Sequence, residues 1–167
     1  MARTTSAGSR SRGISTVGWA LRGAAAGAAG TTALNAVTYL DMAVRGRGSS
    51  STPERTVEAL AGRAHVPIPG QGETREHRLQ GLGPLTGLAA GVGVGVLAGL
   101  ARAAGFRPRL AAGTALTTAV VLVAANGPMT VLGITDPRTW SATDWASDLV
   151  PHLAYGAVVE TTLAAFS

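Results

Sequence analysis

The chain of 167 residues has no cysteine and no lysine, and it contains only two Phe, two Tyr and three Trp. The absence of cysteine excludes disulfide bonds, thiolate catalysis and Cys-ligated zinc or iron–sulfur centres. So few aromatic side chains would make a thin soluble core, whereas abundant Ala, Gly, Val and Leu are typical of closely packed membrane helices. Redox chemistry would require a bound cofactor, and we expect neither a cofactor nor a metal ion.

Charged residues make up only 14% of the chain and leave long uncharged stretches. These stretches are 18 residues between Arg22 and Asp41, 23 between Arg78 and Arg102, and 26 between Arg109 and Asp136. A helix needs about 20 mostly apolar residues to cross a bilayer, so each stretch has a suitable length. The sequence therefore predicts an all-α integral membrane protein, a bundle of four transmembrane helices.

The domain organisation follows from the same pattern. Residues 1–16 are polar and basic and predict a flexible tail, and residues 17–167 predict one transmembrane domain. Because Arg22 interrupts the first apolar run and the run extends past Leu40, it does not match a cleavable signal peptide. The predicted spans are residues 17–44, 82–104, 110–132 and 145–166. The last span contains several polar residues, so a helix lying on the membrane surface is its alternative.

The first loop is expected to contain a short helix. Thr52 would provide the N-cap, followed by a proline at the first helical position and by an acid, Glu54, in the first turn. The apolar side chains of this helix fall on one face, which predicts that it lies along the membrane interface. These side chains belong to Val57, Leu60 and Ala61.

The net charge of +5 and the pI of about 11.2 favour an anionic partner. The arginines flank apolar spans and lack an aromatic platform for stacked bases, so we expect lipid headgroups and no nucleic acid. The arginine count does not decide the orientation, because seven fall on each side. Asp136 and Asp144 in the last loop, with Trp140 and Trp145 as interfacial anchors, favour cytoplasmic termini.

Glycines recur at a strict four-residue interval through the second span, at Gly83, Gly87, Gly91, Gly95 and Gly99. On a helix this spacing produces a groove without side chains, into which another helix can pack closely. Gly23 and Gly27 repeat the spacing in the first span. We expect packing between helices of the same chain, with self-association into a homo-oligomer or a larger membrane complex as the alternative.

If the four spans alternate in direction, several polar residues gather in one half of the bilayer. Intramembrane polar and ionisable groups usually face the interior of a bundle, so this set is the candidate site. Within it, a four-residue spacing from Asp148 to Glu160 makes one face of the fourth span polar, and Pro128 is expected to kink the third span. The alternative is that these groups only join helices. The candidate residues are Asn35, Asp41, Asn126, Asp148, His152 and Glu160, with His77 nearby.

Short motifs in the second half resemble those of the YagU-type small bacterial inner-membrane proteins. They are Gly127-Pro128-Met129, Leu132-Gly133-Ile134-Thr135-Asp136-Pro137, and the stretch from Trp145 through His152-Leu153 to Glu160. The stretch from Thr32 to Arg45 is similar to uncharacterised actinobacterial membrane proteins. The resemblance implies a helical inner-membrane protein without a known catalytic site. The positions that match its motifs are Pro128, Trp145, His152 and Glu160.

Three functions are compatible with these residues. The first is a non-enzymatic membrane component that packs or assembles through its glycines, in a complex or in the cell envelope. The second is a small proton or ion transporter that acts as an oligomer past Asp148, His152 and Glu160. The third is a membrane enzyme that uses an Asp–His pair as acid and base, although nothing in the sequence identifies a nucleophile. We expect the first function.

Overall fold

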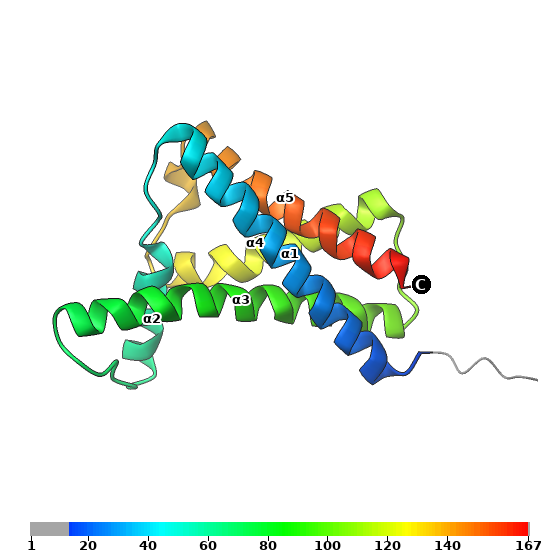
Figure 1. Ribbon diagram of the computed structural model, residues 1–167, viewed down its shortest axis with the longest axis horizontal. Helices are drawn as coiled ribbons and strands as arrows, with labels where there is room; N and C mark the ends of the chain where they lie inside the picture. The colour runs from blue at the N-terminus through cyan, green and yellow to red at the C-terminus, as the bar shows by residue number, and fades with distance from the viewer. Residues whose placement is uncertain (1–13, 167) are drawn as a thin grey trace, which may run out of the picture.

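The computed structural model describes residues 14–166, which form an all-α fold without a strand (Figure 1). Most of the predicted flexible tail lies outside these residues. A short 3-10 helix, η1 (Pro137–Thr139), precedes the last α-helix. The α-helices are α1 (Thr16–Arg45), α2 (Thr52–Arg63), α3 (Glu73–Ala103), α4 (Leu110–Val131) and α5 (Ala142–Ala165).

The four long helices coincide with the four predicted spans, but α3 begins nine residues earlier than expected. Its first part is polar, and Glu73 and Glu76 stabilise the amino end of the helix through the helix dipole. Hydropathy marks only the apolar part of a helix, which explains the difference. With 31 residues, α3 is about 46 Å long, more than the roughly 30 Å of a hydrocarbon core.

The short helix in the first loop is present as α2, but its N-cap lies one residue earlier than predicted. Ser51, not Thr52, occupies the N-cap, and the side chain of Ser50 accepts a hydrogen bond from the Thr52 amide at 3.1 Å. Thr56 and Val57 are buried, whereas Leu60 is 45% exposed. The helix packs on α3 through this narrower surface. At this contact, Pro53 in the first turn of α2 lies against Gly83 of α3.

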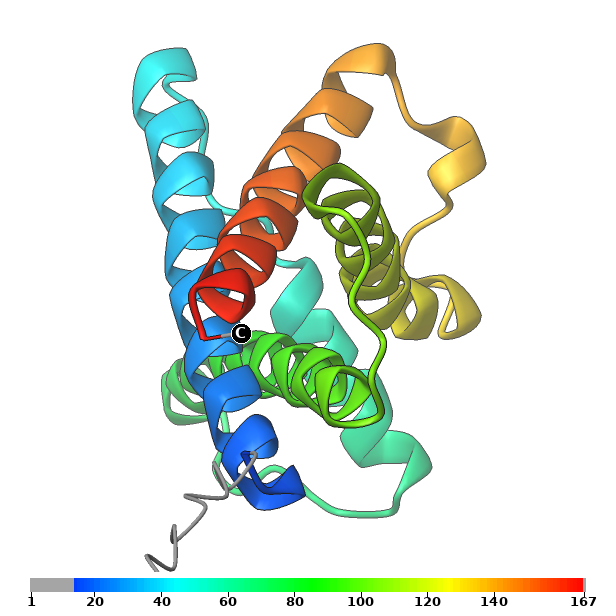
Figure 2. The same cartoon turned by 90° about the vertical axis from the view of Figure 1, so that its right-hand side faces the viewer.

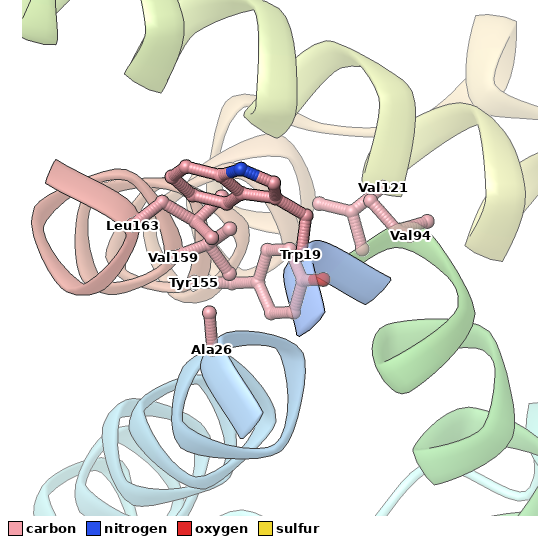
Figure 3. Packing of buried hydrophobic residues seen from close by; sticks show 7 residues of the cluster. All are labelled: Trp19, Ala26, Val94, Val121, Tyr155, Val159 and Leu163. Carbon is pink, nitrogen blue, oxygen red and sulfur yellow. The ribbon is translucent and has the colours of Figure 1, made fainter. Parts of the chain in front are cut away.

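The centre of the fold is α1, which packs against both α3 and α5, while α4 packs on α5 (Figures 1 and 2). Side chains from four helices fill the space between them (Figure 3). Tyr155 is fully buried there, and its hydroxyl donates to the carbonyl oxygen of Gly91 at 2.6 Å. The buried cluster consists of Trp19, Ala26, Val94, Val121, Tyr155, Val159 and Leu163.

The glycines of α3 meet different neighbours. A Cβ atom at Gly95 or Gly99 would collide with the backbone of α1, and one at Gly91 would collide with the Thr31 side chain. Gly23 and Gly27 of α1 show the same crowding against α3, so the two backbones lie in direct contact. Gly87, by contrast, has no neighbour within 4 Å. Four of the five glycines therefore meet helices of the same chain, three of them α1 and Gly83 the short helix α2.

Two helices in the described part of the chain, α3 and α4, are long and apolar enough to cross a membrane. Only 22% of the apolar window of each helix is buried inside the fold. Their apolar side chains therefore point mostly outward, unlike those of a core helix in a soluble protein. Exposed examples are Leu85, Leu88, Leu97, Leu116 and Val123.

Candidate functional site

The polar face of α5 is the surface on which α4 packs. Along this face, Asp148 accepts a hydrogen bond from Asn126 of α4, and Glu160 accepts one from Thr117. Between them, Gly156 has no Cβ atom and lies against the Thr114 carbonyl and the Thr118 side chain. The four-residue repeat thus marks a contact between helices, with one polar cluster toward each end.

The first cluster consists of Asn126, Asp148 and His152. The side-chain amide of Asn126 donates to Asp148 Oδ2 at 2.8 Å. His152 Nδ1 lies 2.6 Å from the backbone oxygen of Asp148 and 3.5 Å from its Oδ1. Since a carbonyl oxygen can only accept, Nδ1 carries the proton in this arrangement and Nε2 of a neutral ring is left as an acceptor. The side chains of Asp148 and His152 are 19% and 11% exposed.

The second cluster is a buried ion pair. Arg102, at the end of α3, donates to Glu160 Oε2 and also to the Phe106 carbonyl at 3.0 Å, while Thr117 donates to Glu160 Oε1 at 2.7 Å. The Arg102 and Glu160 side chains are 6% and 4% exposed. The Glu160 carboxylate lies against Gly113, where a Cβ atom would overlap it. Each charged oxygen therefore has a donor, as a buried carboxylate requires.

Glu160 therefore does not join the other candidate residues. It lies eight residues beyond His152 on α5, which is about 12 Å along a helix. Its side chain also does not reach toward solvent from the end of the chain, because Arg102 and Thr117 hold it in the interior. The prediction of one polar site that includes Glu160 is replaced by two separate clusters.

Asp41 and Asn35 lie apart from both clusters. The Asp41 carboxylate pairs with Arg47 at 2.6 Å and Arg45 at 3.3 Å, and Arg45 donates to Ser147 of α5 at 2.6 Å. A pocket of ≈ 420 Å³ between α1 and the first turns of α5 includes Asp41 and Arg45 in its lining. Asn35 is exposed on α1 and makes no side-chain hydrogen bond within residues 14–166, and His77 is exposed near the start of α3.

The structure adds two residues that the sequence interpretation left out, Arg102 and Thr117. Arg102 falls near the end of the predicted span 82–104, where the sequence marks it only as a charge that bounds an uncharged stretch. Alternating helix directions place the carboxyl ends of α3 and α5 at the same end of the bundle, and this could have paired Arg102 with Glu160. No sequence feature distinguishes Thr117, because the predicted span 110–132 contains several threonines.

The remaining features bear on metals and on the predicted kink. Among residues 14–166, no group of three or more His, Asp or Glu side chains is arranged to hold a metal ion. Helix α4 continues through Pro128 to Val131, and the Thr130 hydroxyl donates to the Asn126 carbonyl at 2.8 Å. The carbonyl that Pro128, which has no N–H, leaves without its helical donor is that of Ala124.

Comparison with protein-family models, with curated proteins and with solved structures found no match. The likeness to the YagU-type proteins consequently stays a prediction, and the function must be inferred from the arrangement of the residues themselves.

Proposed function

We propose that this protein is a multi-pass integral protein of the cytoplasmic membrane, in which α1, α3, α4 and α5 all cross the bilayer. Its role is non-enzymatic: it is a packing and assembly component whose polar groups hold its own helices together. Both termini are on the cytoplasmic side.

The observation that carries this proposal is the large apolar surface that the fold leaves exposed. Large apolar side chains lie on the outside, where Val17, Leu21 and Val44 of α1 are 68%, 67% and 77% exposed. Besides its apolar cluster, the interior also buries the charged side chains of Arg102 and Glu160. In water, such extensive apolar exposure would drive association, whereas lipid tails are as apolar as these side chains. In a hydrocarbon environment, both the exposed apolar side chains and the enclosure of Arg102 and Glu160 inside the bundle are favourable.

The contacts of the polar groups support a packing role. Asp148 is bound by Asn126, and the His152 ring is fixed by the backbone of its own helix. Glu160 is neutralised by Arg102. Each of these polar side chains is therefore partnered by another group of the protein. Interhelical hydrogen bonds of this kind each contribute about 1 kcal/mol in membranes. The His152 ring contacts the backbone oxygen of Asp148, and the Thr118 hydroxyl donates to the backbone carbonyl of His152 at 3.5 Å.

Cysteine labelling tests the topology, because the natural chain has no cysteine. Single-cysteine variants Ser9→Cys, Ser50→Cys, Ala104→Cys and Thr139→Cys would be treated in intact cells with a membrane-impermeant maleimide. Four crossings predict labelling at positions 50 and 139 only, and labelling at 9 and 104 after permeabilisation. If positions 9 and 50 react alike, α1 does not cross, and the four-span proposal fails.

A proton or ion transporter is the second candidate, and one observation favours it. Asp148 and His152 keep partial exposure at an intramembrane helix contact, where ionisable groups often mark ion pathways. Purified protein in liposomes would then dissipate a pH gradient, and His152→Ala would abolish that flux. No flux above that of empty liposomes would exclude this candidate and leave the packing role.

A further inference from the structure

One end of the bundle has arginines without acidic partners. This end contains the start of α1, the α3–α4 loop and the end of α5 (Figures 1 and 2). Its only acid, Glu160, is paired with Arg102. Among residues 14–166, Arg22, Arg107 and Arg109 form no ion pair, and residues 1–13 contain no Asp or Glu that could supply one.

The opposite end is balanced. Its seven arginines are accompanied by eight acids, and several form ion pairs there. The pairs are Asp41 with Arg45 and Arg47, Glu58 with Arg75, and Asp136 with Arg138. The surplus of positive charge is therefore confined to the end that holds Arg22 and Arg107.

Aromatic rings fix two of the unpaired arginines in place. The guanidinium carbons of Arg22 and Arg107 lie 5.5 and 5.7 Å from the centre of the same indole, that of Trp19. Arg22 also lies 5.3 Å from the Phe166 ring and donates to the Phe166 carbonyl at 3.3 Å. These contacts position the cations, but neutral rings leave the net charge of both arginines uncompensated.

The surroundings of these arginines are apolar. Val17 and Leu21 on α1 are mostly exposed, and Phe106 beside Arg107 is 51% exposed. In a bilayer, arginines in such a position extend to the headgroup layer while the apolar side chains remain among the lipid tails. Trp19, which is only 4% exposed, provides a fixed support between α1 and the α3–α4 loop.

We propose that Arg22 and Arg107, supported by Trp19, form a binding site for the phosphate group of an anionic membrane phospholipid. The site rests on the membrane placement proposed above. Guanidinium groups bind phosphate oxygens through paired, charge-assisted hydrogen bonds. A zwitterionic headgroup has the same phosphate but adds a cation, which the surplus positive charge at this end disfavours. The anionic lipid therefore binds selectively.

The test uses Trp19 as its own reporter. In Trp140→Phe/Trp145→Phe, Trp19 is the only tryptophan, and its fluorescence is quenched by brominated lipid bound nearby. The protein would be placed in vesicles of phosphatidylcholine with phosphatidylglycerol, either lipid being brominated in turn. We expect stronger quenching by phosphatidylglycerol at equal mole fraction. Arg22→Gln/Arg107→Gln in the same background should lower the relative affinity about 10- to 30-fold.

The matched control is Arg55→Gln/Arg63→Gln, which removes two exposed and unpaired arginines at the opposite end. It should leave the preference unchanged, although it changes the net charge equally. Equal quenching by both lipids in the parent, or an equal loss in the control, would overturn the proposed site. The proposal would also be overturned if inorganic phosphate abolished the preference for phosphatidylglycerol while chloride at the same ionic strength did not. That result would assign the site to free phosphate. If the protein does not float with vesicles at all, the membrane placement itself fails.

Discussion

The two polar clusters on α5 differ in how completely they are enclosed. Around Glu160, a full positive charge and a hydroxyl meet a carboxylate at 4% exposure. Around Asp148, the neutral side-chain amide of Asn126 meets a carboxylate that is 19% exposed. Removing one partner should therefore lower the free energy of unfolding much more at Glu160 than at Asp148. Burial and charge together, rather than the presence of polar residues, decide which cluster the fold depends on.

The largest effect is expected from Glu160→Gln. It leaves the Arg102 charge buried without a counter-charge, which costs about 3 to 5 kcal/mol in the free energy of unfolding. Unfolding of the detergent-solubilised protein, followed by circular dichroism, would measure it. The double variant Arg102→Met/Glu160→Leu, which removes both charges, should regain most of the loss. If it is as unstable as Glu160→Gln, the pair is not the source of the effect.

A smaller loss, about 1 to 3 kcal/mol, is expected from Gly156→Ala, which lies between the clusters. The added Cβ atom would meet the Thr114 carbonyl oxygen at 2.8 Å, and backbone cannot move aside easily. Gly87→Ala is the control, because no atom lies within 4 Å of its Cβ position. It should be neutral or slightly stabilising, since Ala is the better helix former. Equal losses in the two variants would contradict the close α4–α5 contact.

Asn126→Ala should cost about 1 kcal/mol, the usual value of one interhelical hydrogen bond. The double-mutant cycle with Asp148→Ala would isolate the Asn126–Asp148 interaction from other effects of each change. The same unfolding assay applies. A coupling as large as that between Arg102 and Glu160 would show that the two clusters do not differ as described.

The smallest effect is expected for the exposed pair of Asp136 and Arg138 in the α4–α5 loop. Hydrogen bonding to Arg138 lowers the pKa of Asp136 below its usual value of 3.8. Its contribution is therefore present above pH 3.8 and is lost as the pH falls through the lower folded-state pKa. Asp136→Asn should lower the melting temperature slightly at pH 7 and not at all in strong acid. A difference that persists in strong acid would exclude this ion pair as its cause.

Helix positions were predictable from the sequence because apolar length and charge gaps report directly on them. The start of α3 was not, since Glu73 to Gln80 are helical although all of them except Leu79 are polar. For the site, the four-residue spacing of Asp148, His152 and Glu160 identified the polar face of α5. It could not reveal that this face meets α4, nor that Arg102 reaches Glu160, because those depend on helix rotation and on which helices become neighbours.

The partners of α1 are not its neighbours in the chain. Its glycines rest on Gly91, Gly95 and Gly99 of α3 and on Tyr155 of α5. During synthesis, the first helix must therefore wait with its groove unfilled until more than half of the protein has left the ribosome. Until then its glycines lack the helices that they contact in the finished fold, so the order of translation sets when this helix can pack.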